Sequence, residues 1–253
     1  MRSRIERVAV VGATSSIGRA IATRLARDGA RVVLCGRRVA ELELIAKDIA
    51  IRTGSDARVV RYEALAFDEH AEFVRRAERA FPGEEPGLEG LVVVVGEMAE
   101  QADAEADFAL ARRMIDVNYA SVVSLCEELA PRLAANRGGF LCAVGSVAGD
   151  RGRQSNYLYG STKAALATYV DGLRVRLAKA GVGVTLVKPG FVDTPMTWGR
   201  PGVFLAAKPS VVARDVVRGI RRNRRVVYTP WFWRWILLAV RLAPDALFRR
   251  LAL

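Results

Sequence analysis

Short apolar runs alternate with longer amphipathic segments along most of the chain. The runs are rich in β-branched residues and predict seven strands: Val8–Val11, Val32–Cys35, Arg58–Tyr62, Leu91–Val95, Phe140–Val144, Val184–Val187 and Arg225–Tyr228. Helices are predicted over Ala20–Arg27, Ala40–Arg52 and Ala71–Phe81, and two longer ones over about 106–134 and 157–180. Uninterrupted apolar runs are typical of parallel strands that are buried on both faces. The pattern therefore predicts an α/β fold, a Rossmann-type doubly wound parallel sheet of about seven strands with helices on both faces.

An aromatic and Arg-rich segment follows the last predicted strand, and it divides the chain into a Rossmann-type domain over residues 1–228 and a tail over 229–253. At 100° per residue, the tail forms an amphipathic helix with a narrow charged stripe. The stripe contains Arg234, Arg241, Asp245 and Arg249. Tryptophan beside such a stripe favours a helix lying in a membrane interface. The alternative is that the tail packs in a core or a subunit interface. Membrane binding and subunit packing can also occur together.

Charge is concentrated at the same end of the chain. The 253 residues include 39 Lys and Arg and 27 Asp and Glu, a net charge of +12. Residues 218–253 hold nine Arg and one Asp, so they carry +8 and the preceding residues only +4. This distribution argues against a nucleic-acid partner and favours a local anionic one. Arg221, Arg222, Arg224 and Arg225 are candidates for contact with anionic headgroups.

Cysteine and histidine content argues against a disulfide framework and a metal site. Cys35, Cys126 and Cys142 lie in apolar runs, so buried thiols in a reducing compartment are expected. His70 is the only histidine, and its polar segment predicts a surface position. With no apolar stretch of spanning length and no room for a signal peptide before the first strand, we expect a cytoplasmic protein that is peripheral on the membrane if the tail binds lipid.

A glycine-rich turn joins the first strand to the first helix. It contains Gly12, Thr14, Ser15, Ser16, Ile17 and Gly18. Small residues at this position let backbone N–H groups approach a phosphate at the helix N-terminus, although an ordinary strand–helix turn has the same composition. The second strand ends in Gly36-Arg37 without an acid. Because Arg37 suits a ribose 2′-phosphate, NADP(H) is favoured over NAD(H), and Arg38 is interpreted as a solvated side chain.

A second group of residues predicts acid–base chemistry. Tyr159 and Lys163 are four residues apart, so they share one face of the predicted helix. A neighbouring ammonium lowers a phenol's pKa towards neutrality, which suits a general acid that protonates a ketone oxygen. Ser146 follows the strand ending at Val144, at the same edge of the sheet, where its hydroxyl can bond a substrate carbonyl.

Together these motifs resemble the short-chain dehydrogenase/reductase family from Arg7 to about Tyr228. The matching elements are Gly12-x-x-x-Ser16-x-Gly18, Asn118, Ser146, Tyr159-x-x-x-Lys163 and Pro189-Gly190-x-Val192-x-Thr194. The resemblance implies that Tyr159 is the acid/base, that Lys163 lowers its pKa and holds the nicotinamide ribose, and that Ser146 polarises the carbonyl. It also implies that Asn118 holds a water, that Gly96 lies beside the cofactor, and that the loop of Pro189, Gly190, Val192 and Thr194 closes on the nicotinamide.

Several positions depart from the family pattern. Ser16 replaces a glycine, Val93-Val94-Val95-Gly96 replaces Asn-Asn-Ala-Gly, and the acid expected to meet the adenine is missing near Ala64–Ala66. Asp68 either takes that role from a displaced position or starts the next helix. These features, with the Lys188–Met196 segment and Tyr228-Thr229-Pro230-Trp231, resemble the decaprenylphosphoryl-2-keto-erythro-pentose reductase branch.

The resemblance implies an NADPH-dependent ketoreductase that acts on a lipid-linked keto-sugar in cell-envelope polysaccharide synthesis, under an apolar lid of Trp198, Val203, Phe204 and Leu205. A soluble or lipid ketone, such as a steroid-like or acyl compound, is the first alternative substrate. A non-catalytic scaffold with this fold is the second alternative, and the intact Asn118, Ser146, Tyr159 and Lys163 argue against it. The family also implies a homodimer or homotetramer.

Overall fold

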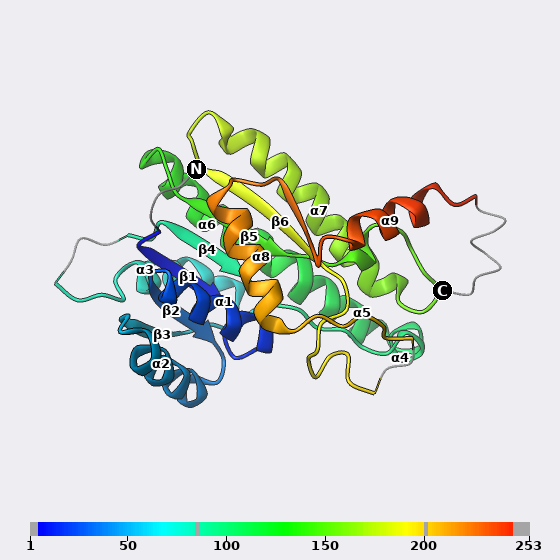
Figure 1. Ribbon diagram of the computed structural model, residues 1–253, viewed down its shortest axis with the longest axis horizontal. Coiled ribbons are helices and arrows are strands. Elements are labelled where there is room, and N and C mark those ends of the chain that lie inside the picture. Colours follow the sequence, from blue (N-terminus) through cyan, green and yellow to red (C-terminus); the bar gives the residue numbers. More distant parts are fainter. Residues whose placement is uncertain (1–4, 84–86, 200–201, 245–253) are drawn as a thin grey trace.

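Seven parallel strands form one sheet in the order β3-β2-β1-β4-β5-β6-β7 (Figure 1). A computed structural model describes residues 5–83, 87–199 and 202–244. The strands are β1 (Arg7–Val11), β2 (Arg31–Gly36), β3 (Ala57–Arg61), β4 (Gly90–Val93), β5 (Phe140–Val144), β6 (Gly183–Pro189) and β7 (Val226–Thr229). The order reverses between β1 and β4, which creates the crevice at the carboxyl ends of the strands where ligands bind in doubly wound folds.

Helices cover both faces of the sheet. They are α1 (Ser16–Arg27), α2 (Val39–Thr53), α3 (His70–Glu78), α4 (Gln101–Ala106), α5 (Phe108–Ile115), α6 (Ser121–Ala135), α7 (Tyr157–Ala178), α8 (Pro209–Arg221) and α9 (Trp233–Leu242). Helices α1 and α8 lie side by side over one face, whereas α3, α6 and α7 pack on the other. The predicted doubly wound fold is therefore confirmed.

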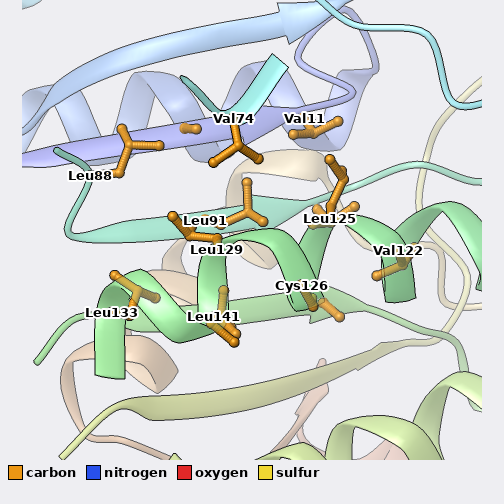
Figure 2. Packing of buried hydrophobic residues seen from close by; sticks show 14 of the residues in the cluster. Val11, Val74, Leu88, Leu91, Val122, Leu125, Cys126, Leu129, Leu133 and Leu141 are labelled. Atoms are coloured by element: carbon orange, nitrogen blue, oxygen red, sulfur yellow. The ribbon is translucent and has the colours of Figure 1, made fainter. Parts of the chain in front are cut away.

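Apolar side chains on both faces of the strands explain this layering. Figure 2 shows Leu125, Leu129 and Leu133 of α6 beside Leu91 of β4 and Leu141 of β5. These side chains repeat at helical spacing on α6, so one face of the helix is apolar along its length. Burial of each such side chain contributes about 1.5–3 kcal/mol before conformational entropy is subtracted. The three cysteines are buried free thiols, as predicted.

The segment predicted as one helix over about 106–134 is broken in two places. The Asp107 side chain accepts a hydrogen bond from Ala109 N at 2.8 Å and so begins a new helix, α5. A π-helical turn over Asp116–Ala120 then separates α5 from α6. Helix α8 is not among the helices predicted from the sequence, although Pro209 in its first turn is a signal for the start of a helix.

The prediction of a surface position for His70 is wrong. Its side chain is buried, with Nδ1 2.8 Å from Ser124 Oγ and Nε2 3.2 Å from the Glu63 carbonyl oxygen. Both ring nitrogens thus have partners, and the ring packs beside Tyr62. The polar segment before α3 folds inward at this one residue, because hydrogen bonds on both nitrogens offset the loss of water. Burial lowers the pKa of His70.

Candidate active site

The turn after β1 is built to receive a phosphate group. Gly12 has φ +83°, and a Cβ there would lie 2.7 Å from the Val94 carbonyl oxygen, so only glycine fits. The Ser15 hydroxyl donates to the Gly12 carbonyl at 2.7 Å and accepts from Gly18 N at 3.0 Å. This cap fixes the start of α1 and points its N-terminus at the crevice, where amide groups and the helix dipole favour an anion.

A pocket of about 540 Å³ opens over this turn. Of the predicted cofactor residues, Gly12, Thr14, Ser15, Arg37 and Gly96 lie on its wall. Ser16, Ile17 and Gly18 lie off the wall, in the first turn of α1. The turn, the dipole and the pocket together fit a dinucleotide, with its diphosphate at Gly12–Ser15.

Two arginines stand at the β2 edge of the pocket. The Arg37 side chain is exposed and makes no hydrogen bond or ion pair with any residue that the structure describes. Arg38 also lines the pocket, and its Nε pairs with Glu41 Oε2 at 2.9 Å at the start of α2. Arg38 thus combines the predicted helix-start position with a place on the pocket wall. Arg37 has its guanidinium free for an anion.

Glu63 is a pocket residue that the sequence interpretation missed. It follows β3 and lines the pocket between Tyr62 and Ala64. Asp68, by contrast, belongs to a short 3₁₀ turn (Phe67–Glu69) that leads into α3 and is not part of the pocket wall. A carboxylate two residues after β3 was the available signal, because the carboxyl ends of parallel strands form the ligand-binding edge.

Gly96 connects the pocket to the predicted catalytic residues. A Cβ at Gly96 would lie 3.5 Å from Lys163 Nζ and 3.8 Å from Asn118 Oδ1. Asn118 is buried in the π-helical turn and is held on both sides of its amide. Its Oδ1 accepts from Glu97 N at 2.7 Å, and its Nδ2 donates to the Glu97 carbonyl at 2.8 Å. The π-turn therefore ties α5 and α6 to the end of β4 at the catalytic centre.

Tyr159, Ser146 and Lys163 come together at the start of α7. A Cβ at Gly160 would lie 2.8 Å from the Ala148 carbonyl oxygen, so this glycine lets α7 approach the turn after β5. The Ser146 side chain lies near enough to the Tyr159 phenol to lower its pKa, and Ser146 Oγ accepts a hydrogen bond from Ala148 N at 3.1 Å. Lys163 Nζ lies 5.7 Å from the centroid of the Tyr159 ring. The structure thus places the three side chains in one cluster.

Electrostatics in this cluster differ from the expectation that Lys163 lowers the pKa of Tyr159. Burial raises the pKa of Tyr159 to about 12, and the Ser146 side chain opposes this rise. Burial also lowers the pKa of Lys163 to about 8. The Lys163 ammonium points to the carbonyl oxygens of Val95 and Val144, 3.4 Å from each, rather than to the phenol oxygen. Desolvation therefore outweighs the attraction between these two groups.

The predicted nicotinamide loop lies apart from the pocket wall, beyond the end of β6. Val192 is buried and forms a bridge with Ala207, which closes the loop at its base. Thr194 accepts at its carbonyl from Thr197 Oγ1 at 2.9 Å. Gly190 follows Pro189, the last residue of β6, and packs against the Trp233 indole of α9. None of Pro189, Gly190, Val192 and Thr194 lines the pocket, and Gly190 instead contacts the tail.

Helix α9 turns one apolar face to this loop and leaves another exposed. Trp233 and Leu237 are buried and pack with Val147, and the Trp233 ring contacts Phe191 edge-on and Phe204 at a tilt. Trp231, Trp235, Leu238 and Leu242 are exposed. No helix of the described residues is both long and apolar enough to cross a bilayer. The predicted stripe continues to Asp245 and Arg249, which lie outside the described residues.

Two contacts attach α9 to the turn that carries Ser146: Val147 packs on Trp233, and Arg151 reaches the end of α9. Between these two residues, Asp150 pairs with Lys188 of β6 and accepts from the Tyr228 hydroxyl of β7. Arg151 Nη1 donates to the carbonyls of Val240 at 2.5 Å and Ala243 at 2.7 Å. A cation at a helix C-terminus meets the negative end of its dipole. Ser146 and α9 thus share one support.

Comparison with known proteins identifies the family. Residues 6–201 match the short chain dehydrogenase family. The chain belongs to this family. An uncharacterized oxidoreductase from Mycobacterium tuberculosis is 33% identical over 244 residues, 96% of each chain, and one from Streptomyces coelicolor is 34% identical over 244 residues, 96% of this chain and 94% of the relative. The prediction of an NAD(P)-dependent short-chain oxidoreductase is thereby confirmed.

Solved short-chain dehydrogenases share the fold. A 7β-hydroxysteroid dehydrogenase superposes with a TM-score of 0.82 at 22% identity, covering 98% of this chain and 96% of the other. A short-chain dehydrogenase from Sphingobium yanoikuyae in complex with NADPH gives 0.78 at 22% identity, with 96% and 98% covered. An actinorhodin polyketide ketoreductase with NADPH gives 0.78 at 23% identity, with 88% and 95% covered.

Proposed function

We propose that this short-chain dehydrogenase is an NADPH-dependent ketoreductase. The contact of Ser146 with Tyr159, beside Lys163 and at the end of the dinucleotide pocket, is the observation that carries the proposal. When bound, the nicotinamide supplies the hydride. The chain's own residues supply the proton and hold the carbonyl.

Tyr159 is the proton donor in this proposal. Since burial keeps its pKa at about 12, the phenol is protonated at neutral pH, which is the state that a general acid needs for reduction. The Ser146 hydroxyl bonds the same carbonyl oxygen and orients it towards Tyr159. Lys163, whose pKa burial lowers to about 8, remains mostly protonated at pH 7 and holds the ribose hydroxyls. Asn118 fixes the turn beside Lys163 and holds the water that leads to solvent.

NADP(H) is the cofactor in this proposal, with NAD(H) the weaker ligand. The free guanidinium of Arg37, with Arg38 beside it on the pocket wall, supports a 2′-phosphate at the end of β2. Glu63 is a suitable acceptor for the adenine amino group. Structural neighbours from Sphingobium yanoikuyae and the actinorhodin pathway were solved with NADPH, which supports the same assignment.

The substrate that we propose is a lipid-linked keto-sugar of cell-envelope synthesis. An apolar wall of Val147, Phe191, Phe204 and Trp233 stands beside Ser146 and suits a ligand with a hydrocarbon part. The exposed apolar face of α9 supports a cytoplasmic enzyme that lies peripherally on the membrane carrying such a lipid. A homodimer or homotetramer is the assembly that we propose, as the family implies.

A second candidate is the reduction of a steroid-like or acyl ketone. The same apolar wall favours it, and the neighbours named as a hydroxysteroid dehydrogenase and a polyketide ketoreductase act on molecules of these classes. Reduction of a short-chain ketone by a variant consisting of residues 1–228, at the rate of the full chain, would favour this candidate over a membrane-bound substrate.

Replacement of Tyr159 by Phe tests the ketoreductase. We expect NADPH-dependent reduction of a ketone to fall by about 10²–10⁴-fold, because the proton donor is lost. Tyr157→Phe is the matched control, since this phenol lies two residues away and bonds Glu105 instead. Equal loss in the two variants, or undiminished turnover in Tyr159→Phe, would contradict the assignment.

A further inference from the structure

A second pocket of about 350 Å³ lies between α7, the second half of β6, the start of β7 and the last turn of α9. Its charged lining residues are Arg174 and Asp171 of α7, Lys188 of β6, Arg225 before β7 and Arg241 of α9. None of the predicted catalytic or cofactor residues lines this pocket. It is therefore separate from the dinucleotide pocket.

Positive charge in this pocket exceeds what the neighbouring carboxylates neutralise. Lys188 pairs with Asp150, and Arg225 Nη2 pairs with Asp171 Oδ2 at 2.6 Å. Arg174 Nη1 donates only to a neutral group, the Val184 carbonyl, at 2.9 Å. The Arg241 side chain is exposed and has no hydrogen bond or ion pair among residues 5–83, 87–199 and 202–244. Two cationic groups thus remain for an anion, which suits a phosphate.

An exposed apolar surface begins at the same turn of α9. Leu238 is one helical turn before Arg241 and is 44% exposed, and Leu242 directly after it is 73% exposed. Trp235, three residues before Leu238, is 57% exposed and extends the same face. Arg241 therefore stands where an apolar face meets a cationic pocket. A membrane lipid has this same combination of hydrocarbon chains beside a phosphate.

We propose that this pocket binds the phosphate of an anionic membrane lipid while the exposed face of α9 rests among the lipid chains. The inference builds on the membrane association proposed above and adds a defined headgroup site to it. In this proposal Arg241 and Arg174 contact the phosphate, while Lys188, which also lines the pocket, stays paired with Asp150. Because Asp150 and Arg151 follow the turn that carries Ser146, the lipid binds to the structural support of the catalytic site.

Vesicle binding of the full chain tests this site. We expect firm binding to vesicles of equimolar phosphatidylcholine and phosphatidylglycerol, and roughly five- to thirtyfold weaker binding after Arg241→Glu, since reversal removes one favourable charge and adds a repulsive one. Arg241→Lys keeps the charge and should stay within about twofold. Arg79→Glu, the same change at the exposed residue that directly follows helix α3, is the matched control.

Soluble ligands separate the contribution of the lipid phosphate from that of the acyl chains. Dihexanoyl phosphatidic acid below its micelle concentration should bind and change the tryptophan fluorescence, whereas glycerol phosphate should bind more weakly and dihexanoylglycerol should not bind. If Arg241→Glu and Arg79→Glu had equal effects on vesicle binding and on binding of dihexanoyl phosphatidic acid, the proposed phosphate site would be refuted. Loss of an oligomer in Arg241→Glu by sedimentation would also refute it, since the pocket would then be a subunit contact.

The outcomes also separate this inference from the membrane proposal itself. If the protein binds phosphatidylcholine vesicles as well as the anionic ones, membrane association stands and the headgroup site is refuted. If it binds no vesicles, membrane association is refuted. Binding of the soluble phosphatidic acid then decides whether the pocket takes a lipid phosphate. Reduction of a soluble ketone should be unchanged in Arg241→Glu, which shows that the catalytic site is intact.

Discussion

The packing of Trp233 on Gly190 gives the sharpest prediction about the wall beside the active site. In Gly190→Ala the new methyl group would lie 1.9 Å from Trp233 Nε1, far inside the 3.4 Å at which ordinary contact begins. The indole must therefore retreat by ~1.5 Å against Phe191 and Phe204, which an interior packed at crystal density resists.

We expect Gly190→Ala to lower the free energy of unfolding by about 1–3 kcal/mol, the usual cost of overpacking. Undocking of α9 sets an upper limit of roughly 3–6 kcal/mol, because it would expose Trp233 and Leu237. All four tryptophans of the chain lie in the β6–α8 loop or in the segment that contains α9, so their fluorescence reports on this region, whereas circular dichroism reports on the whole fold. In urea, the fluorescence transition of the variant should move to lower concentration.

A double-mutant cycle with Trp233→Leu isolates this contact. In that background Gly190→Ala should cost less than about 0.5 kcal/mol, giving a coupling of about 0.5 kcal/mol or more. Gly172→Ala is the control, since no atom lies within 4 Å of the added methyl group and alanine favours the α7 helix. Equal costs of Gly190→Ala with and without Trp233 would refute the packing described here.

Three further predictions concern single side chains. Lys163→Met should stabilise the fold by roughly 1–3 kcal/mol below pH 8 while abolishing reduction, because the folded state lowers the pKa of Lys163 from 10.5 to about 8 and so penalises the charged form. Between about pH 8 and 10.5 the Lys163 side chain is protonated in the unfolded chain and neutral in the folded one, so the stability of the wild type rises with pH. The stability advantage of Lys163→Met should therefore shrink across this range. Chemical denaturation of both proteins at several pH values checks this direction. Arg37→Ala should weaken NADPH binding by about 10–100-fold and leave NADH binding unchanged in a fluorescence titration, and equal losses for the two would exclude a 2′-phosphate contact. Arg151→Ala should loosen α9 by about 1–3 kcal/mol, seen as faster hydrogen exchange over residues 233–242, with Arg153→Ala as the nearby comparison.

The sheet was predictable from sequence because its strands are apolar on both faces, so runs such as Leu91–Val95 need no tertiary information to be recognised. The breaks in the 106–134 segment were not predictable from sequence, because a π-turn at Asn118 preserves the helical pattern of the residues around it. The residues that form the catalytic cluster were predictable, since their fixed spacings place them at one edge of the sheet. Its electrostatics were not, because the Lys163 ammonium turns to two backbone carbonyls that no spacing reveals.

The tail illustrates the limit of periodicity. Trp233 and Trp235 are two residues apart in an almost wholly apolar helix, so composition does not indicate which ring turns inward. The structure decides it through Gly190, whose missing side chain leaves room for one indole. Glu63 was missed for a related reason: the acid stands slightly earlier along the chain than the positions near Ala64–Ala66 where it was sought.

The order of these parts along the chain has a consequence for biosynthesis. The last residue that lines the dinucleotide pocket is Val117, whereas Trp233 follows about 120 residues later, roughly 6–24 s at ordinary elongation rates. Gly190 and Phe191 are made about 40 residues before Trp233, so for roughly the last 2–8 s of this interval they lack the indole that covers them. A nascent chain can therefore hold a formed nucleotide half and an uncovered apolar loop at the same time, which makes this loop the place where a chaperone would bind during synthesis.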